Sequence, residues 1–210
     1  MRFSRSIVVA ALAAALAVPA AAQVNVVPQV GVTSAYVGRT TYSAAFIGLV
    51  PPAAATDIIC LAGSATKRVV LQQIKLSGSA GTLVTLPITL VRRVSVATGG
   101  TAAATTANPA NTISKRTVSS PTATAVPISY TAVPTITDAA PTYVDSASLT
   151  LPTTAAGTVT VPLNFDYSAG NSNLIQAPQL DGAAAQFCLN FNTIGISSGV
   201  LNGVITWTEE

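Results

Sequence analysis

Histidine is absent from the 210 residues of this sequence, and charged residues make up only 8% of it. Without histidine the chain has no Ser-His-Asp or Cys-His pair of the usual kind, and it lacks the commonest ligand of catalytic zinc. Gly99-Gly100 is not followed by the Lys-Ser or Lys-Thr of a phosphate-binding loop. The sequence therefore predicts a protein that is not an enzyme and holds no cofactor or metal.

Carboxylates are also few, and each lies in sequence that is typical of a turn or a chain end. A glycosidase needs two carboxylates that face each other across a cleft. Asp138 and Asp145 form the nearest pair within the body of the chain, but no supporting motif surrounds them. Asp166 and Asp181 precede turn-forming residues. Turn capping is favoured for all four over catalysis, and no EF-hand spacing supports calcium binding.

The N-terminus has the pattern of a secretory signal peptide. Arg2 and Arg5 precede the apolar run Ile7–Val18, and Ala20-Ala21-Ala22 offers a small-residue cleavage site before Gln23. The run is too short to span a membrane comfortably, although an uncleaved anchor is the alternative. We predict that residues 1–22 are removed and that the protein is exported to the periplasm, the extracellular space or a virion, with no membrane segment afterwards.

Loss of this segment lowers the formal net charge from +3 to +1, because Arg2 and Arg5 leave with it. Nothing global then favours nucleic acid or anionic lipid as a partner. Ordinary soluble domains contain roughly 25% charged residues. A surface this poor in charge lacks the residues that usually keep strand edges apart. Such a composition suits an extracellular or assembled protein.

The remaining sequence predicts an all-β fold, because short β-branched and apolar runs alternate with turns and no sustained helical period appears. We expect one β-sandwich or jelly-roll-like domain over residues 55–210. A long loop rich in Thr and Ala is expected at 97–127, either ordered with strands or not. Pro87 makes its run an edge strand or two strands joined by a bulge. The expected strands are 57–61, 69–76, 83–96, 128–133, 148–151, 158–163, 174–177, 186–191 and 200–208.

Residues 23–54 form a separate N-terminal segment with little core of its own. Val24–Val32 is rich in valine, and Pro51-Pro52 ends the segment. It is interpreted as an arm that packs on a neighbouring molecule or as edge strands. The sequence does not decide between the two.

Two cysteines, Cys60 and Cys188, are present in the whole chain. In an oxidising compartment such a pair favours a disulfide, because both lie within expected strands that can be neighbours. The alternative is two buried thiols that act as small apolar groups.

The residues proposed to contact a partner are Arg92, Arg93 and Trp207. Successive side chains of a strand point to opposite faces, so one of the two arginines is expected to face the core side and need an aspartate there. Scattered solvated charges are the alternative for this pair. Trp207, the single tryptophan, is favoured as a core or rim anchor over a ligand-stacking platform.

Four stretches carry a resemblance to a known group of proteins: residues 55–78, Leu90-Val91-Arg92-Arg93 before a Gly-Gly-Thr loop, Cys188-Leu189-Asn190-Phe191-Asn192, and Ile205-Thr206-Trp207-Thr208-Glu209-Glu210. They resemble small structural proteins encoded in tailed-phage and prophage gene clusters, over most of residues 55–210. The resemblance implies a virion-associated or decoration-type β-sandwich without enzymatic activity. The signal peptide and the two cysteines suggest a relative adapted to export.

The leading functional prediction is therefore an exported structural or assembly protein that associates with copies of itself or joins a larger assembly. The alternative is a monomeric secreted module that recognises cell-surface glycan or protein through loops. A hydrolase with an atypical carboxylate site is the third and least favoured hypothesis.

Overall fold

A computed structural model describes residues 39–102, 113–138, 140–153, 161–168, 176–192, 195–196 and 198–210. The chain divides into two units, Met1–Gly38 and Arg39–Glu210, and the described residues belong to the second. The predicted signal peptide lies outside the described residues and stays a prediction. In the part that the structure describes, no helix is long and apolar enough to cross a membrane.

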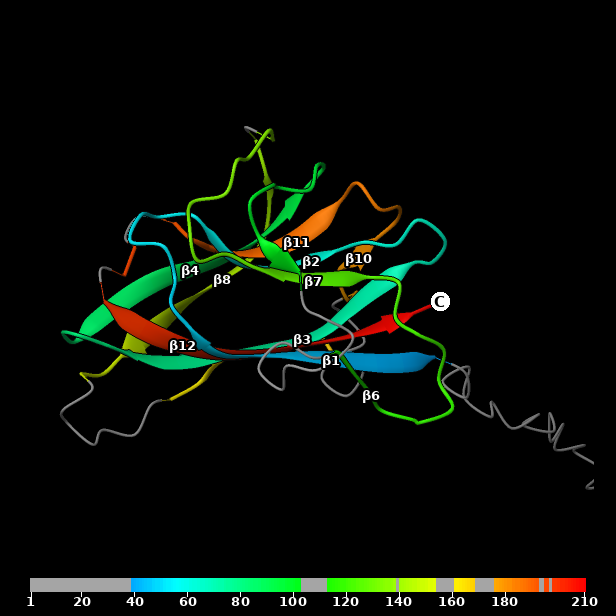
Figure 1. The fold of residues 1–210 in the computed structure, drawn as a ribbon, viewed down its shortest axis with the longest axis horizontal. Coiled ribbons are helices and arrows are strands. Elements are labelled where there is room, and N and C mark those ends of the chain that lie inside the picture. Colours follow the sequence, from blue (N-terminus) through cyan, green and yellow to red (C-terminus); the bar gives the residue numbers. More distant parts are fainter. Residues whose placement is uncertain are drawn as a thin grey trace, which may run out of the picture. The chain divides into compact units, whose positions relative to one another are not determined.

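The described residues form two antiparallel sheets packed against each other, so the predicted β-sandwich is confirmed (Figure 1). The first sheet, sheet A, has the order β10-β3-β12-β1-β6, and β9 also pairs with β3. Its strands are β1 (Thr40–Leu49), β3 (Val69–Ala80), β6 (Ile113–Lys115), β9 (Leu163–Asp166), β10 (Gln179–Leu180) and β12 (Gly199–Glu209).

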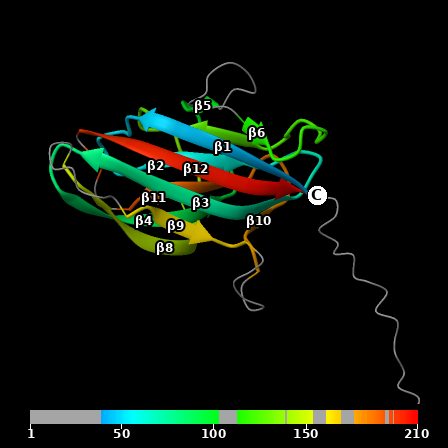
Figure 2. The ribbon, with the colours of Figure 1, turned by 90° about the horizontal axis from the view of Figure 1, so that it is seen from below.

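The second sheet, sheet B, has the order β5-β7-β2-β11-β4-β8. Its strands are β2 (Asp57–Ala62), β4 (Val84–Arg93), β5 (Thr101–Ala102), β7 (Val126–Ser129), β8 (Thr142–Leu151) and β11 (Gln186–Phe191). Figure 2 views the sandwich from the side of sheet A, where β1, β12 and β3 run next to one another.

The main core lies between the two sheets and follows the alternation of the strands. On β12, Leu201, Ile205 and Trp207 are buried in this core, whereas Asn202 and Val204 between them are exposed. Strands place successive side chains on opposite faces, which is the alternation that the sequence of this strand predicts. Trp207 stacks on Tyr42 of β1, with ring centroids 5.7 Å apart. The sandwich therefore joins its first and last strands through their largest side chains.

A second, smaller apolar cluster covers the outer face of sheet B. We call it the outer cluster; its buried members are Cys60, Val91, Ala97, Tyr130 and Cys188. Ala97 comes from the segment after β4, and its carbonyl accepts a hydrogen bond from the hydroxyl of Tyr130. The same segment forms a β-bridge between Thr98 and Thr135. Part of sheet B is therefore buried on both faces.

The structure corrects the prediction for residues 23–54 over the part that it describes. β1 pairs with β12 along its length and with β6 over Tyr42–Ala44, and it buries Tyr42, Ala44 and Phe46 in the main core. It is an integral strand of sheet A, and among the described residues only its second half has no neighbour on the β6 side. The prediction of little core is wrong here, because the partner that buries β1 is the C-terminal strand.

Pro87 lies within one continuous strand, β4, which pairs with β8 over Val84–Arg92 and with β11 over Ile88–Arg93. The proline therefore precedes the pairing with β11, so its missing N–H breaks no ladder on that side. A register shift against β8 lies between Leu90 and Val91. The predicted edge strand and the predicted pair of strands are both wrong, because β4 is a single strand between β11 and β8.

The predicted loop 97–127 contains β5 and β6 and reaches the start of β7, and its residues 103–112 lie outside the described residues. The expected strand 148–151 is longer than predicted, because β8 begins at Thr142. The expected strands 158–163 and 174–177 fall partly outside the described residues, and β9 and β10 begin later, at Leu163 and Gln179.

Candidate interaction surface

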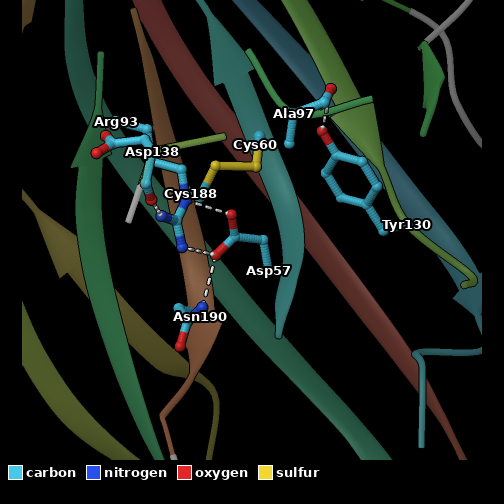
Figure 3. The surroundings of a disulfide bond; sticks show 8 residues. All are labelled: Asp57, Cys60, Arg93, Ala97, Tyr130, Asp138, Cys188 and Asn190. Atoms are coloured by element: carbon cyan, nitrogen blue, oxygen red, sulfur yellow. Dashed lines mark hydrogen bonds and ion pairs between the residues drawn. A yellow bond between two sulfur atoms is a disulfide. The ribbon is translucent and has the colours of Figure 1, made fainter. Parts of the chain in front are cut away.

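The predicted disulfide between Cys60 and Cys188 is confirmed (Figure 3). The two residues face each other directly in the ladder between β2 and β11, so the register of sheet B brings them together. Both side chains are fully buried in the outer cluster. A disulfide of this kind indicates an oxidising location outside the cytoplasm.

Arg93 forms a buried ion pair with Asp57 beside the disulfide. Its Nε atom lies 2.5 Å from Oδ2 of Asp57, and its Nη2 atom lies 3.0 Å from Oδ1. The amide of Asn190 donates to Oδ1 at 2.6 Å, and Nη1 of Arg93 donates to the carbonyl of Asp138 at 3.1 Å. Figure 3 shows these groups converging from separate strands. The network ties β2, β4 and β11 to the segment that covers them.

This burial corrects the predicted partner contact for Arg93, whose exposed fraction is 4%. Its guanidinium is already paired with an aspartate, as expected, but on the outer face of sheet B beside the outer cluster and not on the side of the main core. Trp207 is 0% exposed and is also excluded as a contact, because it is a core anchor. Arg92 is exposed, and its contact with a partner stays a prediction.

Glu209 is a buried acid at the end of β12 that sequence reasoning passed over. Its carboxylate accepts hydrogen bonds from the amides of Thr124 and Ala125, from the Thr124 hydroxyl, and from Nε1 of Trp207. Nζ of Lys67 lies 3.4 Å away. Burial alone raises the pKa of Glu209, but the hydrogen bonds outweigh it and the net pKa is lowered. The residue is therefore a structural anion.

The aspartates considered as catalytic candidates have structural partners. Asp138 accepts hydrogen bonds from the amides of Val94 and Ala140, and Asp181 forms an ion pair with Arg68 at 2.8 Å. These contacts support the interpretation as loop-stabilising groups.

Asp166 caps the turn after β9. Its carboxylate accepts from the hydroxyl and the amide of Ser168, and these hydrogen bonds lower its pKa. Asp145 differs from the prediction, because it lies on strand β8 and not in a loop. It accepts a hydrogen bond of 2.7 Å from the hydroxyl of Tyr167, and burial and this bond raise the pKa of the tyrosine. That contact links the two sheets at the edge of the sandwich.

Among the described residues, one group of side chains has metal-ligand spacing: Asp57, Cys60 and Cys188, whose ligand atoms lie within 4.8 Å of one another. The two sulfur atoms are bonded to each other, and the carboxylate is held by Arg93 and Asn190. All three residues are already used in the folded, oxidised protein, so the group offers no site for a cation in this state.

The long edge strand β8 is the most open element of sheet B. Among the described residues it pairs with β4 alone, so the hydrogen-bonding groups along its other side have no strand partner there. Residues 142–146 are all exposed, including Tyr143 at 65% and Val144 at 36%. Asp145 is the single charged residue of the strand. We call this side of β8 the free edge.

A groove of about 700 Å³ runs beside the free edge, on the surface of β4 and β8. Its lining includes Pro87, Thr89, Tyr143, Ser146 and Asn192, and Asp145 is its single charged residue. The groove therefore combines an exposed aromatic ring with hydroxyl and amide groups, and it has no basic residue.

The outer face of sheet A is the second open surface. The register aligns Ser43, Thr206 and Gln73 across three neighbouring strands, and Ala45 and Val204 lie in the adjacent row. In Figure 2 these strands are in full view, with no described strand across their centre. The face is polar, and a pocket of about 260 Å³ lies on it, lined by residues that include Ser43, Gln73 and Thr206 together with the basic residues Lys115 and Arg116.

No protein-family model, curated protein or solved structure matches this chain.

Proposed function

We propose that this protein is a non-enzymatic, exported structural subunit that assembles with copies of itself, as a decoration or appendage protein of phage-virion type. The free edge of β8 carries the proposal. Soluble proteins usually protect a long edge strand with charged residues, proline, a bulge or a covering segment. Along β8 the sequence Thr142–Leu151 has neither lysine nor proline and exposes Tyr143 and Val144, and its protection is limited to Asp145 and the register shift beside Val144.

The rest of the surface supports assembly. The outer face of sheet A presents rows of Ser, Thr, Gln and Val beside Lys75, Lys115 and Arg116, which suits a polar contact with a second molecule. The disulfide supports export, and the predicted signal peptide refines this to a periplasmic, extracellular or virion-associated location. The absence of histidine and the structural contacts of the described aspartates support a non-enzymatic role.

The test is the absolute mass of residues 23–210 in solution, measured by light scattering on a sizing column under non-reducing conditions over a range of protein concentrations. We expect a trimer or larger assembly. A monomer at every concentration would contradict the proposal, because a structural subunit must associate with its neighbours.

The groove beside β8 favours a second function, recognition of a neutral glycan. Sugar sites pair an exposed aromatic face with uncharged hydrogen-bonding groups, and Tyr143, Ser146 and Asn192 supply both kinds of group here. A monomer that binds neutral oligosaccharides on a glycan array would favour this function over assembly. An assembled protein that binds none of the oligosaccharides would contradict glycan recognition and support assembly as the function.

A further inference from the structure

The free edge of β8 offers backbone donors and acceptors to an incoming strand. On the side of an edge strand that faces away from its sheet, backbone N–H and C=O groups form hydrogen bonds with water. An extended segment from another chain can replace this water and pair with these groups. Side chains at alternate positions of the added strand then determine which segment fits. The ten residues of β8 provide room for an added strand of ordinary length.

A segment with the required pattern lies in the same sequence, ahead of the sandwich. Positions 24, 26, 28, 30 and 32 are Val, Val, Pro, Val and Val, and the positions between them are Asn, Val, Gln and Gly. Apart from Val27, this is the two-residue alternation of a strand that is buried on one face. The described sandwich begins at Arg39, and this segment precedes it in the sequence.

Two further features match the segment to an edge. No charged residue occurs between Gln23 and Gly38, and β8 itself carries only Asp145, so no like charges oppose their pairing. Pro28 lies within the alternating run. A strand added to β8 becomes the new edge of sheet B, where a proline is tolerated and blocks a further strand.

We propose that residues 24–32 of one copy add as a strand to the free edge of β8 in a second copy. This inference rests on the proposed function, self-assembly, and names the contact that produces it. The donor segment and the acceptor edge are different surfaces, so the contact is head-to-tail. Copies joined in this way form a closed ring if the rotation closes, and a filament if it does not.

The first experiment changes the donor segment in the mature chain, residues 23–210. Val30→Asp/Val32→Asp places two charges on the apolar face of the segment, and Asn25→Asp/Gln29→Glu places two charges on its other face. Burial of two valine side chains at the contact predicts that the first variant weakens association at least about 100-fold. The control variant should stay within about tenfold of the unchanged chain, measured by light scattering or sedimentation.

The second experiment changes the acceptor edge. Tyr143→Lys adds to β8 the kind of charge that protects natural edges. Val118→Lys is the matched control, because Val118 is 98% exposed and lies outside β8. We expect Tyr143→Lys to dissociate the assembly and Val118→Lys to leave it intact. Circular dichroism of each variant confirms that the sandwich is still folded.

A labelled peptide of residues 23–38 supplies a direct measurement that does not depend on assembly. It should bind to the Val30→Asp/Val32→Asp variant, whose β8 edge is vacant, with a change in fluorescence anisotropy. Addition of Tyr143→Lys to that variant should abolish binding. A peptide that carries Val30→Asp/Val32→Asp should not bind.

The outcomes separate this inference from the proposed function. A monomeric unchanged chain contradicts both. An assembly that survives both the donor and the acceptor variants leaves the proposed function standing and overturns strand addition at β8. Loss of assembly in the donor variant alone, with the peptide still bound by Tyr143→Lys, also overturns it, because the acceptor then lies elsewhere.

Discussion

Replacement of Arg93 by methionine tests how much the buried polar network contributes to the fold. In Arg93→Met the Asp57 carboxylate, which is 0% exposed, loses both guanidinium hydrogen bonds and keeps only the amide of Asn190. Removal of one partner from a buried ion pair costs about 3–5 kcal/mol, since the remaining charge is left without compensation. We expect the free energy of unfolding to fall by about 4 kcal/mol, a large part of the total for a domain.

Urea unfolding under non-reducing conditions measures this change, and the fluorescence of the buried Trp207 reports it. With a slope of about 2 kcal/mol per molar urea, the midpoint should fall by about 2 M. The control is Arg92→Met, an exposed neighbour on the same strand, which should stay within about 0.5 kcal/mol of the unchanged protein. Equal losses in Arg93→Met and Arg92→Met would refute the argument.

The double variant Asp57→Leu/Arg93→Met separates an unpaired charge from lost packing. Replacement of both charges leaves no uncompensated ion, so the double variant should be more stable than Arg93→Met. The single variant Asp57→Leu completes the comparison. If the double variant loses as much free energy of unfolding as Asp57→Leu and Arg93→Met lose together, the two residues are not energetically coupled.

Two further predictions concern the other buried groups. Because the folded-state pKa of Glu209 is lowered, its contribution to stability is present above its ordinary value of 4.5 and is lost as the pH falls through the lower, folded-state pKa. Glu209→Gln should therefore lower the free energy of unfolding by about 1–3 kcal/mol at pH 7. Thermal unfolding should show that this difference between the variant and the unchanged protein becomes smaller below pH 4.5. A difference that does not depend on pH would contradict the prediction. Cys60→Ala/Cys188→Ala opens a loop that spans 128 residues and should lower the free energy of unfolding by up to about 5 kcal/mol in urea, and an unchanged midpoint would count against it.

Local pattern was sufficient to predict the strands whose alternation is strong. β11 and β12 were predicted to within one residue, because buried and exposed side chains alternate along most of β12 and β11 is a short apolar run. The pairing of Cys60 with Cys188 also followed from two expected strands in an exported chain. The prediction that one of the two adjacent arginines needs an aspartate is confirmed for Arg93, but the predicted face is wrong, since Arg93 lies on the outer face with the outer cluster.

Long-range pairing accounts for what the sequence did not reveal. β1 contains Ser43, Ala44 and Ala45, which carry weak strand preference, and its burial depends on β12 at the other end of the chain. The first half of β8 lies between Pro141 and Asp145 in sequence that is typical of a loop. Pairing with β4 makes it a strand, and the alternation of Ala147, Leu149 and Leu151 was the signal to extend.

The few charges are distributed unevenly, and this distribution bears on assembly. Three ion pairs join Lys67 to Glu209, Arg68 to Asp181, and Arg39 to Glu210, and each involves the end of β12 or the segments hydrogen-bonded near it. The six residues of these pairs therefore lie near the end of the sandwich where the C-terminus lies, as Figure 1 shows for that terminus, and a fourth pair, Asp57 with Arg93, is buried beside the disulfide. The free edge of β8 carries a single carboxylate. Since charge is a usual protection of an edge strand, an edge with one carboxylate opposes a second copy only weakly.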